Sequence, residues 1–170
     1  VTDDLAAYYR ARALGSGPGL IIAEHCCISE AGRADSAQLS IAEDSCIAEH
    51  RRLTDAVHEA GSRIFIQMNH AGNAAEPFDG GELVSASDVP ALRKTLQKKP
   101  RPLTAEEIQE LEQSFVRAAQ RAVEAGYDGV EIHSAHGYLL DQFYSPLTNR
   151  REDEYGAGSV ENRLRFLLET

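Results

Sequence analysis

Three segments of this 170-residue chain repeat one local pattern, and that pattern limits the folds available to it. In each segment a glycine precedes a short apolar run, and polar side chains follow the run. The glycines are Gly15, Gly61 and Gly126. The apolar runs are 20–23 and 64–66, and the third run, 130–132, has Val and Ile on either side of a Glu. A glycine commonly ends a helix, and a short apolar run is typical of a buried strand. Each segment therefore predicts a helix, a loop and a strand.

Periodic apolar residues predict the helices. Residues 105–125 place apolar side chains on one face at 3.6 residues per turn, and Thr104 with Glu107 forms a capping-box sequence. The other expected helices span about 3–14, about 45–60 and a segment that starts near Val160. The residues expected to face inward are Leu5, Tyr8, Tyr9, Leu14, Ile47, Leu53, Ala56, Val57, Ile108, Leu111, Phe115, Ala118, Ala119, Ala122, Leu164, Phe166, Leu167 and Leu168.

Helices that alternate with short buried strands indicate a parallel sheet, either an open doubly wound sheet or a (β/α)8 barrel. A dinucleotide-binding open sheet should carry Gly-x-Gly-x-x-Gly after a strand, but the glycine-rich segment 15–19 precedes its strand and contains a proline. Polar groups at every strand end are typical of a barrel, whose catalytic face lies there. The sequence predicts an α/β fold of the TIM-barrel type. Because a full barrel needs roughly 250 residues, only part of one is expected.

The charge and hydropathy of the chain argue against nucleic acids and membranes as partners. Acidic residues number 27 against 17 basic ones, a net charge of −10, whereas a duplex-binding surface needs clustered Lys and Arg. The one basic cluster consists of Arg93, Lys94, Lys98, Lys99 and Arg101. It lies among prolines and polar residues, which is typical of a solvated loop. The apolar run 20–23 is far shorter than the ~20 residues of a membrane span.

The cysteines indicate a reducing compartment. Cys26 and Cys27 are adjacent, which disfavours a bond between them, and Cys46 makes the total odd. The start of the chain also lacks the basic stretch and apolar segment of a signal peptide. We therefore expect a cytoplasmic protein.

Two imidazoles and a phenol follow the third strand within six residues. His133, His136 and Tyr138 can converge on one small volume, and crowding of titratable groups at one rim favours a functional site. A structural alternative is that either histidine only bonds the backbone. A metal site is a further alternative, because His133 and His136 have a ligand-like spacing and His70 could add a third ligand.

Polar residues also follow the two earlier strands. Gln67 comes after the run 64–66, where its amide can both donate to and accept from a planar heterocycle. Its alternative role is to satisfy local backbone groups. The cluster that contains His25 follows the run 20–23 and is the least informative of the three.

The stretch 130–165, VEIHSAHGYLLDQFYSPLTNRREDEYGAGSVENRLR, closely resembles the Old Yellow Enzyme family of FMN-dependent NAD(P)H:flavin oxidoreductases and ene-reductases. Supporting matches are AVHEAGSRIFIQMNHAG at 56–72 and GPGLIIAEHCCISEAGR at 17–33. The similarity runs in order over nearly the whole chain and is weakest across about 73–103. The resemblance implies a (β/α)8 barrel with FMN at its mouth. Residues 1–170 would form one partial domain with strands two to four, without the first strand and the C-terminal half.

The resemblance also implies roles for individual residues. Gln67 matches the glutamine that bonds the pyrimidine edge of the flavin, and His25 lies near the flavin. His133 and His136 match the pair that binds the carbonyl or nitro oxygen of the substrate, and Tyr138 matches the proton donor. The implied reaction uses NAD(P)H to reduce an electrophilic alkene, namely an enone, an enoate or a dienoyl thioester. Homo-oligomerisation is left open, as is an iron-sulfur cluster from residues after Thr170.

The sequence departs from the family pattern at three places. His25 stands where many members carry a small residue, and Asn73 stands where many carry Arg. The segment 156–159 has one residue more than usual. Two other functional classes remain alternatives. One is a non-catalytic fragment or a subunit that a partner completes, and the weaker one is a metal-dependent barrel hydrolase.

Overall fold

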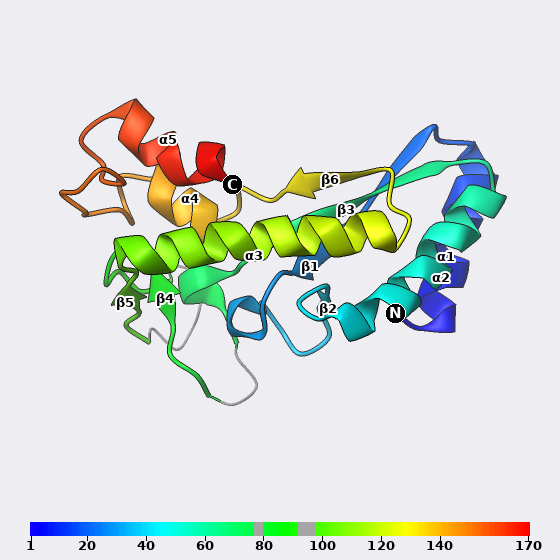
Figure 1. Cartoon of the computed structure of the whole chain (residues 1–170), viewed down its shortest axis with the longest axis horizontal. Coiled ribbons are helices and arrows are strands. Elements are labelled where there is room, and N and C mark those ends of the chain that lie inside the picture. The colour runs from blue at the N-terminus through cyan, green and yellow to red at the C-terminus, as the bar shows by residue number, and fades with distance from the viewer. Residues whose placement is uncertain (77–79, 92–97) are drawn as a thin grey trace.

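The computed structural model describes residues 1–76, 80–91 and 98–170, in which a parallel sheet in the order β2-β1-β3-β6 is covered by helices (Figure 1). The strands are β1 Leu20–Cys27, β2 Leu39–Ser40, β3 Arg63–Asn69, β4 Val84–Ser85, β5 Arg101–Pro102 and β6 Gly129–Ile132. The α-helices are α1 Asp3–Ser16, α2 Ile47–Glu59, α3 Ala105–Glu124, α4 Leu139–Tyr144 and α5 Val160–Glu169. Short 3-10 turns are η1 Glu30–Gly32, η2 Asp44–Cys46 and η3 Gly72–Ala74. Of the basic cluster, Arg93 and Lys94 lie outside the described residues.

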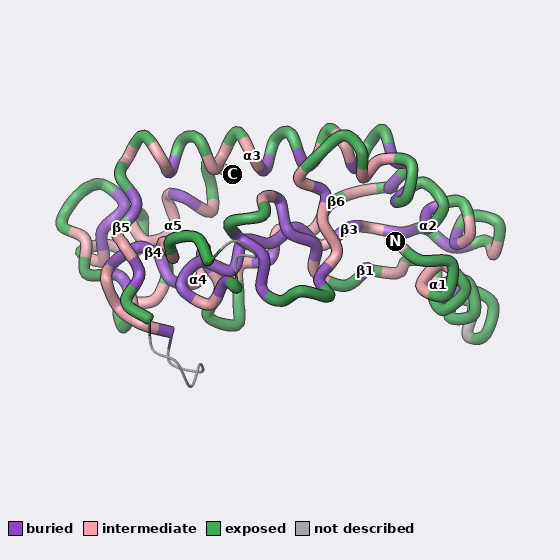
Figure 2. The backbone as a smooth tube through the Cα atoms, turned by 90° about the horizontal axis from the view of Figure 1, so that it is seen from below, coloured by how far each residue is buried: buried purple, intermediate pink, exposed green. Residues whose placement is uncertain are grey.

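The sheet has one face against helices and one face against a cavity. Along β3, Ile64, Ile66 and Met68 are buried, whereas Phe65 and Gln67 are only half-buried. Side chains alternate across a strand, so the first set points to the helices α2 and α3 and the second set points to the opposite face. Figure 2 shows this layering from a second direction, with α3 lying along one side of the strands. The alternation assigns the polar side chains of β3 to the face without helices.

Helix α3 confirms the periodicity read from the sequence. Ile108, Phe115, Ala118 and Ala122 are fully or almost fully buried, as their common face predicts. At its start, Glu107 N donates to Thr104 Oγ1 at 3.2 Å, and Thr104 N donates to Glu107 Oε2 at 2.8 Å. The capping box is therefore formed in both directions. The expected helices over 3–14, 45–60 and from Val160 are likewise present as α1, α2 and α5.

Glycines in the left-handed region end or follow the helices, but the first was misassigned. Helix α1 runs on to Ser16 and its C-cap is Gly17, with φ 60°, rather than Gly15. Gly61 and Gly126 take φ values of 86° and 89°. A side chain strains such a backbone conformation, so these three positions favour glycine.

Three of the inward assignments in α1 and α5 were wrong. Tyr8 and Leu14 of α1 are 46% and 57% exposed, and the buried residues there are Tyr9 and Ala13. Leu168 of α5 is 76% exposed. Tyr8 and Leu14 lie one position before Tyr9 and one position after Ala13, so the rotation of about 100° per residue turns them toward solvent.

The strands are longer than their apolar runs, and short elements were missed. β1 continues through Cys27 and β3 through Asn69, so the first two polar clusters lie within strands rather than after them. The sequence showed three strands, whereas β2 adds a two-residue fourth to the sheet and β4 pairs with β5 elsewhere. Helix α4 was also missed. Elements of two to six residues are too short to show a hydrophobic period.

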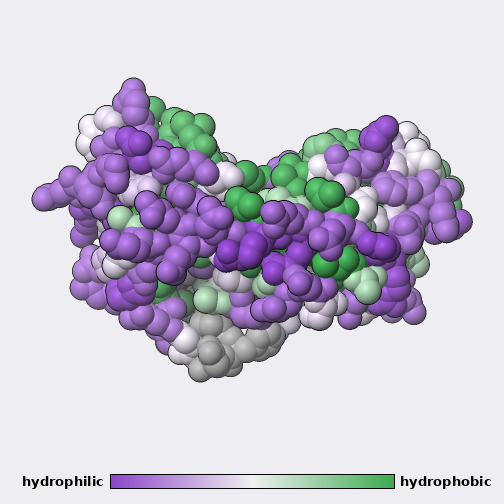
Figure 3. All heavy atoms as spheres, viewed as in Figure 1, coloured by the Kyte–Doolittle hydropathy of each residue, from purple (hydrophilic) through white to green (hydrophobic). Residues whose placement is uncertain are grey.

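The cavity-facing side of the sheet is incompletely covered. Leu20 and Ile22 of β1 pair with Arg63 and Phe65 of β3, so they lie on this side, and both are exposed apolar residues. Figure 3 shows the molecule hollowed along the edge that carries β6, with hydrophobic residues gathered around the hollow. A closed barrel would bury such residues in its interior, and the prediction of a partial barrel is confirmed. Among the helices of the described residues, none has the length and apolar character needed to cross a membrane.

Replacement of Thr104 by Ala should lower the free energy of unfolding of the intact protein by about 1 kcal/mol, because it leaves the Glu107 amide without its cap. Chemical denaturation measures this change. Ser114→Ala on the same helix is the matched control, since that exposed hydroxyl bonds within the helix, to the Glu110 carbonyl and the Arg117 guanidinium, and caps no helix end. Equal stability of the two variants would contradict a role for the cap.

Candidate active site

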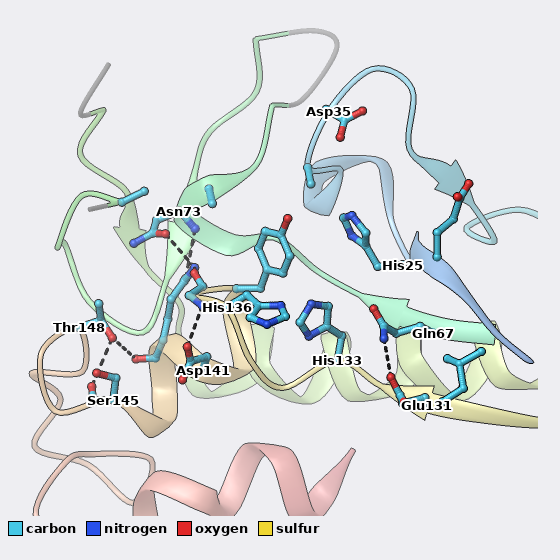
Figure 4. Close-up of a pocket in the computed structure, with 18 of the residues that line it drawn as sticks. His25, Asp35, Gln67, Asn73, Glu131, His133, His136, Asp141, Ser145 and Thr148 are labelled. Carbon is cyan, nitrogen blue, oxygen red and sulfur yellow. Dashed lines mark hydrogen bonds between the residues drawn. The ribbon is translucent and has the colours of Figure 1, made fainter. Parts of the chain in front are cut away.

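A row of polar side chains crosses the cavity-facing side of the sheet. The register pairs His25 of β1 with Gln67 of β3, and Gln67 with Glu131 of β6. Paired residues of neighbouring strands lie about 4.8 Å apart and point to the same face. Gln67 Nε2 donates to Glu131 Oε1. A carboxylate only accepts, so this bond fixes the amide orientation and leaves Gln67 Oε1 on the other side, toward the cavity, as Figure 4 shows.

A β-bulge aims His25 into this row. Between Ile22 and His25, β1 uses three residue steps where β3 uses two, from Phe65 to Gln67. In a regular ladder Glu24 would stand opposite Gln67. The extra residue turns His25 to the cavity instead, which is a common use of bulges beside active sites.

The aromatic side chains after β6 form one cluster with His25. The centroid of the His133 ring lies 5.0 Å from that of His136 and 5.1 Å from that of Tyr138, and both pairs are edge to face. The Tyr138 ring stacks on His25 at 5.5 Å with an interplanar angle of 25°. Edge-to-face and offset pairs are the arrangements that aromatic rings prefer. The trio expected from the sequence is therefore brought together, and His25 joins it.

The loop that carries these rings adopts an uncommon backbone. His136 has φ 60°, and Gly137 follows at φ 77°. Asp141 Oδ2 accepts from Gly137 N at 2.7 Å and stabilises the turn. A non-glycine residue in the left-handed region costs energy and is often found at functional sites.

Gln142 ties this loop to the chain after β3. This fully buried amide donates to Gly137 O at 2.7 Å and to Asn73 Oδ1 at 2.8 Å, and its oxygen accepts from Ser85 Oγ at 2.8 Å. Asn73, where the family often has Arg, is buried and serves this network. A buried polar network of this kind specifies a single arrangement only when its members are bonded. Gln142 thus holds the His136–Tyr138 turn in place.

Burial favours the neutral form of two site imidazoles, His133 and His25. It lowers the pKa of His133, and the neighbouring His136 and His25 lower it further. Burial also lowers the pKa of His25, although Asp35 and Glu24 oppose the effect. Ala135 N donates to His133 Nδ1 at 3.3 Å. The proton of neutral His133 is therefore on Nε2, which makes that atom a hydrogen-bond donor.

These residues line a cavity of about 1160 Å³. Figure 4 shows His25, Gln67 and Glu131 on one side of it and His133 and His136 beside them. Its other lining residues are Ile22, Ala23, Glu24, Ala34, Asp35, Asn73, Ala74, Ala91, Gly137, Tyr138, Asp141, Gln142, Ser145, Leu147 and Thr148. The cavity exceeds the 300–1,000 Å³ typical of ligand pockets, so it has room for a cofactor together with a substrate.

The residues to which the resemblance gave roles, His25, Gln67, His133, His136 and Tyr138, all line this cavity, whereas Glu131, Asp141 and Gln142 were missed. Glu131 could have been found, because it lies two positions before His133 on an alternating strand. Gln142 could not, because its partners Ala71 and Asn73 are distant in sequence.

The proposed third metal ligand lies outside the cluster. His70 is buried, its ring packs against Gly32, and its Nδ1 accepts from Gly72 N at 3.1 Å. Among the described residues, no group of three or more His, Cys, Asp or Glu side chains is placed to hold a metal ion.

The donor set of the cavity fits a flavin ring. Gln67 presents an amide oxygen, and His25 and His133 present imidazoles beside a broad apolar and aromatic surface. A planar heterocycle with alternating donors and acceptors along one edge matches such a set.

Comparisons with known proteins agree with this geometry. The model of the NADH:flavin oxidoreductase / NADH oxidase family matches residues 1–170. The chain is 46% identical to an NADPH dehydrogenase of Geobacillus sp. (strain WCH70), over 95% of this chain and 46% of that protein. It is 44% identical to an NADH:acrylate oxidoreductase of Vibrio harveyi, over 99% of this chain and 16% of that protein.

Solved structures agree as well. An Old Yellow Enzyme homologue from Zymomonas mobilis superposes with a TM-score of 0.92 at 38% identity, over 99% of this chain and 48% of that chain. The chain thus spans about half the length of the NADPH dehydrogenase and of this structural neighbour.

Acid should destabilise the protein through His70. Burial lowers the pKa of this imidazole to about 4 in the folded state, against 6.5 as its ordinary value. The unfolded chain then binds the proton more tightly, so stability is full above about pH 6.5 and falls as the pH drops toward 4, by about 3 kcal/mol. Unfolding free energies of the intact protein from pH 8 to 4 should fall less steeply for His70→Gln. Parallel curves for the two proteins would contradict this assignment.

Proposed function

The chain belongs to the NADH:flavin oxidoreductase / NADH oxidase family, and from that premise we propose that the intact protein is an FMN-dependent enzyme that reduces activated alkenes with NAD(P)H. The observation that carries the proposal is the convergence of His133, His136 and Tyr138 on one cavity beside Gln67. The names of two relatives support it, because one is an NADPH dehydrogenase and the other is an NADH:acrylate oxidoreductase, and acrylate is an activated alkene.

FMN, when bound, supplies the hydride chemistry, and this chain supplies binding, orientation and electrostatics. Gln67 Oε1 is positioned to accept from an N–H on the ring edge, because Glu131 holds the amide nitrogen. Removing a hydrogen bond to a buried ring edge costs about 1–3 kcal/mol. Gln67 therefore contributes to the affinity for the cofactor.

The histidine pair is proposed to stabilise negative charge on the substrate. When hydride adds to the β-carbon of an enone, charge develops on the carbonyl oxygen. His133 Nε2 carries a proton and is a donor, and His136 stands beside it at 5.0 Å between ring centroids. Preorganised donors aimed at a developing oxyanion accelerate a reaction by roughly 10²–10³ each.

Tyr138 is proposed to deliver the proton to the α-carbon. Its ring is held between His25 and His133, which restricts the directions in which the hydroxyl can point. The turn that carries it is fixed by Gln142 and Asp141. A positioned acid of this kind contributes about 10²–10⁴-fold.

One observation favours a second candidate, a partial barrel that binds FMN only after a partner subunit or further residues of the same protein complete it. Ile22 exposes apolar surface on the open side of the sheet, and within the described residues β6, which carries the exposed Val130, is an edge strand. Such an edge is normally paired or covered. Size-exclusion chromatography with a flavin absorbance scan tests this, because a partner-completed protein binds FMN only in the associated form.

Replacement of Tyr138 by Phe should leave flavin reduction by NAD(P)H unchanged and slow enone reduction by about 10²–10⁴-fold. Nitroalkenes, whose reduced anion persists without enzymatic protonation, should be affected far less. Anaerobic stopped-flow on the intact protein separates the two half-reactions, with the exposed Tyr144→Phe as a matched control. An equal fractional loss on both substrates would exclude Tyr138 as the proton donor, and a wild-type protein without bound FMN would overturn the proposed function.

A further inference from the structure

We propose that His25 is a hydrogen-bond donor to the bound flavin and that Gln38 fixes it in the donor tautomer. The inference rests on the proposed function, since it requires FMN in the cavity. It starts from an imidazole that the reaction described above does not use. His25 lines the cavity next to Gln67 and stacks on Tyr138.

The orientation of the Gln38 amide is set by the backbone. Gln38 Oε1 accepts from Ala34 N at 2.7 Å, and a backbone N–H can only donate. The amide nitrogen is therefore the atom that faces His25. It lies 2.9 Å from His25 Nδ1 and also donates to His25 O at 3.3 Å.

This contact determines where His25 carries its proton. Because Gln38 Nε2 is a donor, Nδ1 of His25 must accept, and the proton of the neutral ring is on Nε2. Asn69 Nδ2 is also a donor and lies 3.3 Å from His25 Nδ1, so it too favours the tautomer with the proton on Nε2. Burial favours the neutral ring by lowering its pKa. His25 is thus a neutral donor through Nε2.

The segment around Gln38 is built to hold this amide. Arg33 Nη1 donates to Gln38 O, and the same guanidinium is paired with Glu30. Gln38 and Arg33 are both buried. The backbone carbonyl and the side-chain oxygen of Gln38 are both bonded, so its Nε2 is a donor at a fixed position. Gln38 is therefore a positioning residue for His25.

Neighbouring groups on β1 and β3 then offer complementary bonds. Gln67 Oε1 accepts, because Glu131 holds its nitrogen, and His25 Nε2 donates. The two residues are direct partners in the ladder, about 4.8 Å apart at the backbone. An imide edge, with an N–H beside a carbonyl oxygen, matches one acceptor beside one donor. The pyrimidine edge of a flavin has this chemistry.

The donor should favour the reduced cofactor. Reduction places more negative charge on the ring carbonyls, so a hydrogen bond to one of them is stronger in the reduced state. The expected signature is a change in both FMN affinity and midpoint potential, and neither readout depends on turnover.

The experiment compares wild type, His25→Phe and His25→Gln of the intact protein. His25→Phe keeps a ring but no donor, and should weaken oxidised FMN about threefold and reduced FMN about thirtyfold. The tenfold difference corresponds to about 30 mV of lower midpoint potential for a two-electron couple. His25→Gln places an amide donor near the position of Nε2 and should restore most of both values.

The tautomer is measured separately. The ¹⁵N shifts of ¹⁵N-histidine-labelled wild type should identify His25 as the Nε2–H form. Gln38→Leu should mix the two tautomers and lower the potential in the same direction as His25→Phe. Gln109→Leu, an exposed glutamine of α3, is the matched control and should change neither.

The outcomes separate this inference from the proposed function. Wild-type protein that does not bind FMN overturns the function and the inference together. Wild type that binds FMN, with an unchanged potential in His25→Phe, overturns the inference alone. If His25→Phe does not fold, an Nδ1–H tautomer in wild type overturns the inference and an Nε2–H form with a lowered potential in Gln38→Leu supports it.

Discussion

The register of three parallel strands is the constraint on which the site depends. Because β1, β3 and β6 are parallel, their carboxyl ends meet at one edge, and residues paired across the ladder share a face. His25, Gln67 and Glu131 form one row for this reason. A slip of one residue in β3 would turn Gln67 toward the helices and bring the apolar Ile66 or Met68 to the cavity. The bulge in β1 is part of the same register, since it brings His25 rather than Glu24 opposite Gln67.

Polar groups that are themselves bonded hold the reactive side chains in place. Gln142 fixes the turn after β6, and Gln38 fixes the ring of His25. Backbone groups set the orientation of both side-chain amides. Gln38 Oε1 accepts from Ala34 N, and Gln142 Nε2 donates to the carbonyls of Gly137 and Ala71. Burial keeps His133 and His25 neutral, so the cavity presents donors without positive charge. Neutral donors can stabilise an oxyanion without holding it as a permanent ion pair.

Local sequence patterns predicted the main helices and strands. The features that they missed are either very short or depend on contacts between residues that are distant in the sequence. The 3.6-residue period and the capping box predicted α3, and apolar runs predicted the starts of β1, β3 and β6. The bulge was missed because a single extra residue leaves no trace in a run of eight, and α4 was missed because six residues make less than two turns. Gln142 and Gln38 were missed because their partners are known only once the chain is folded. The cluster of His133, His136 and Tyr138 was found because all three lie on one short segment.

The most direct test is a crystal structure of the intact protein with FMN and an enone. The account predicts the flavin ring in the described cavity, with its pyrimidine edge within hydrogen-bonding distance of Gln67. It also predicts the carbonyl oxygen of the enone between His133 and His136. A flavin bound elsewhere, or a strand β3 whose Gln67 side chain points toward α2, would contradict the register on which the account rests.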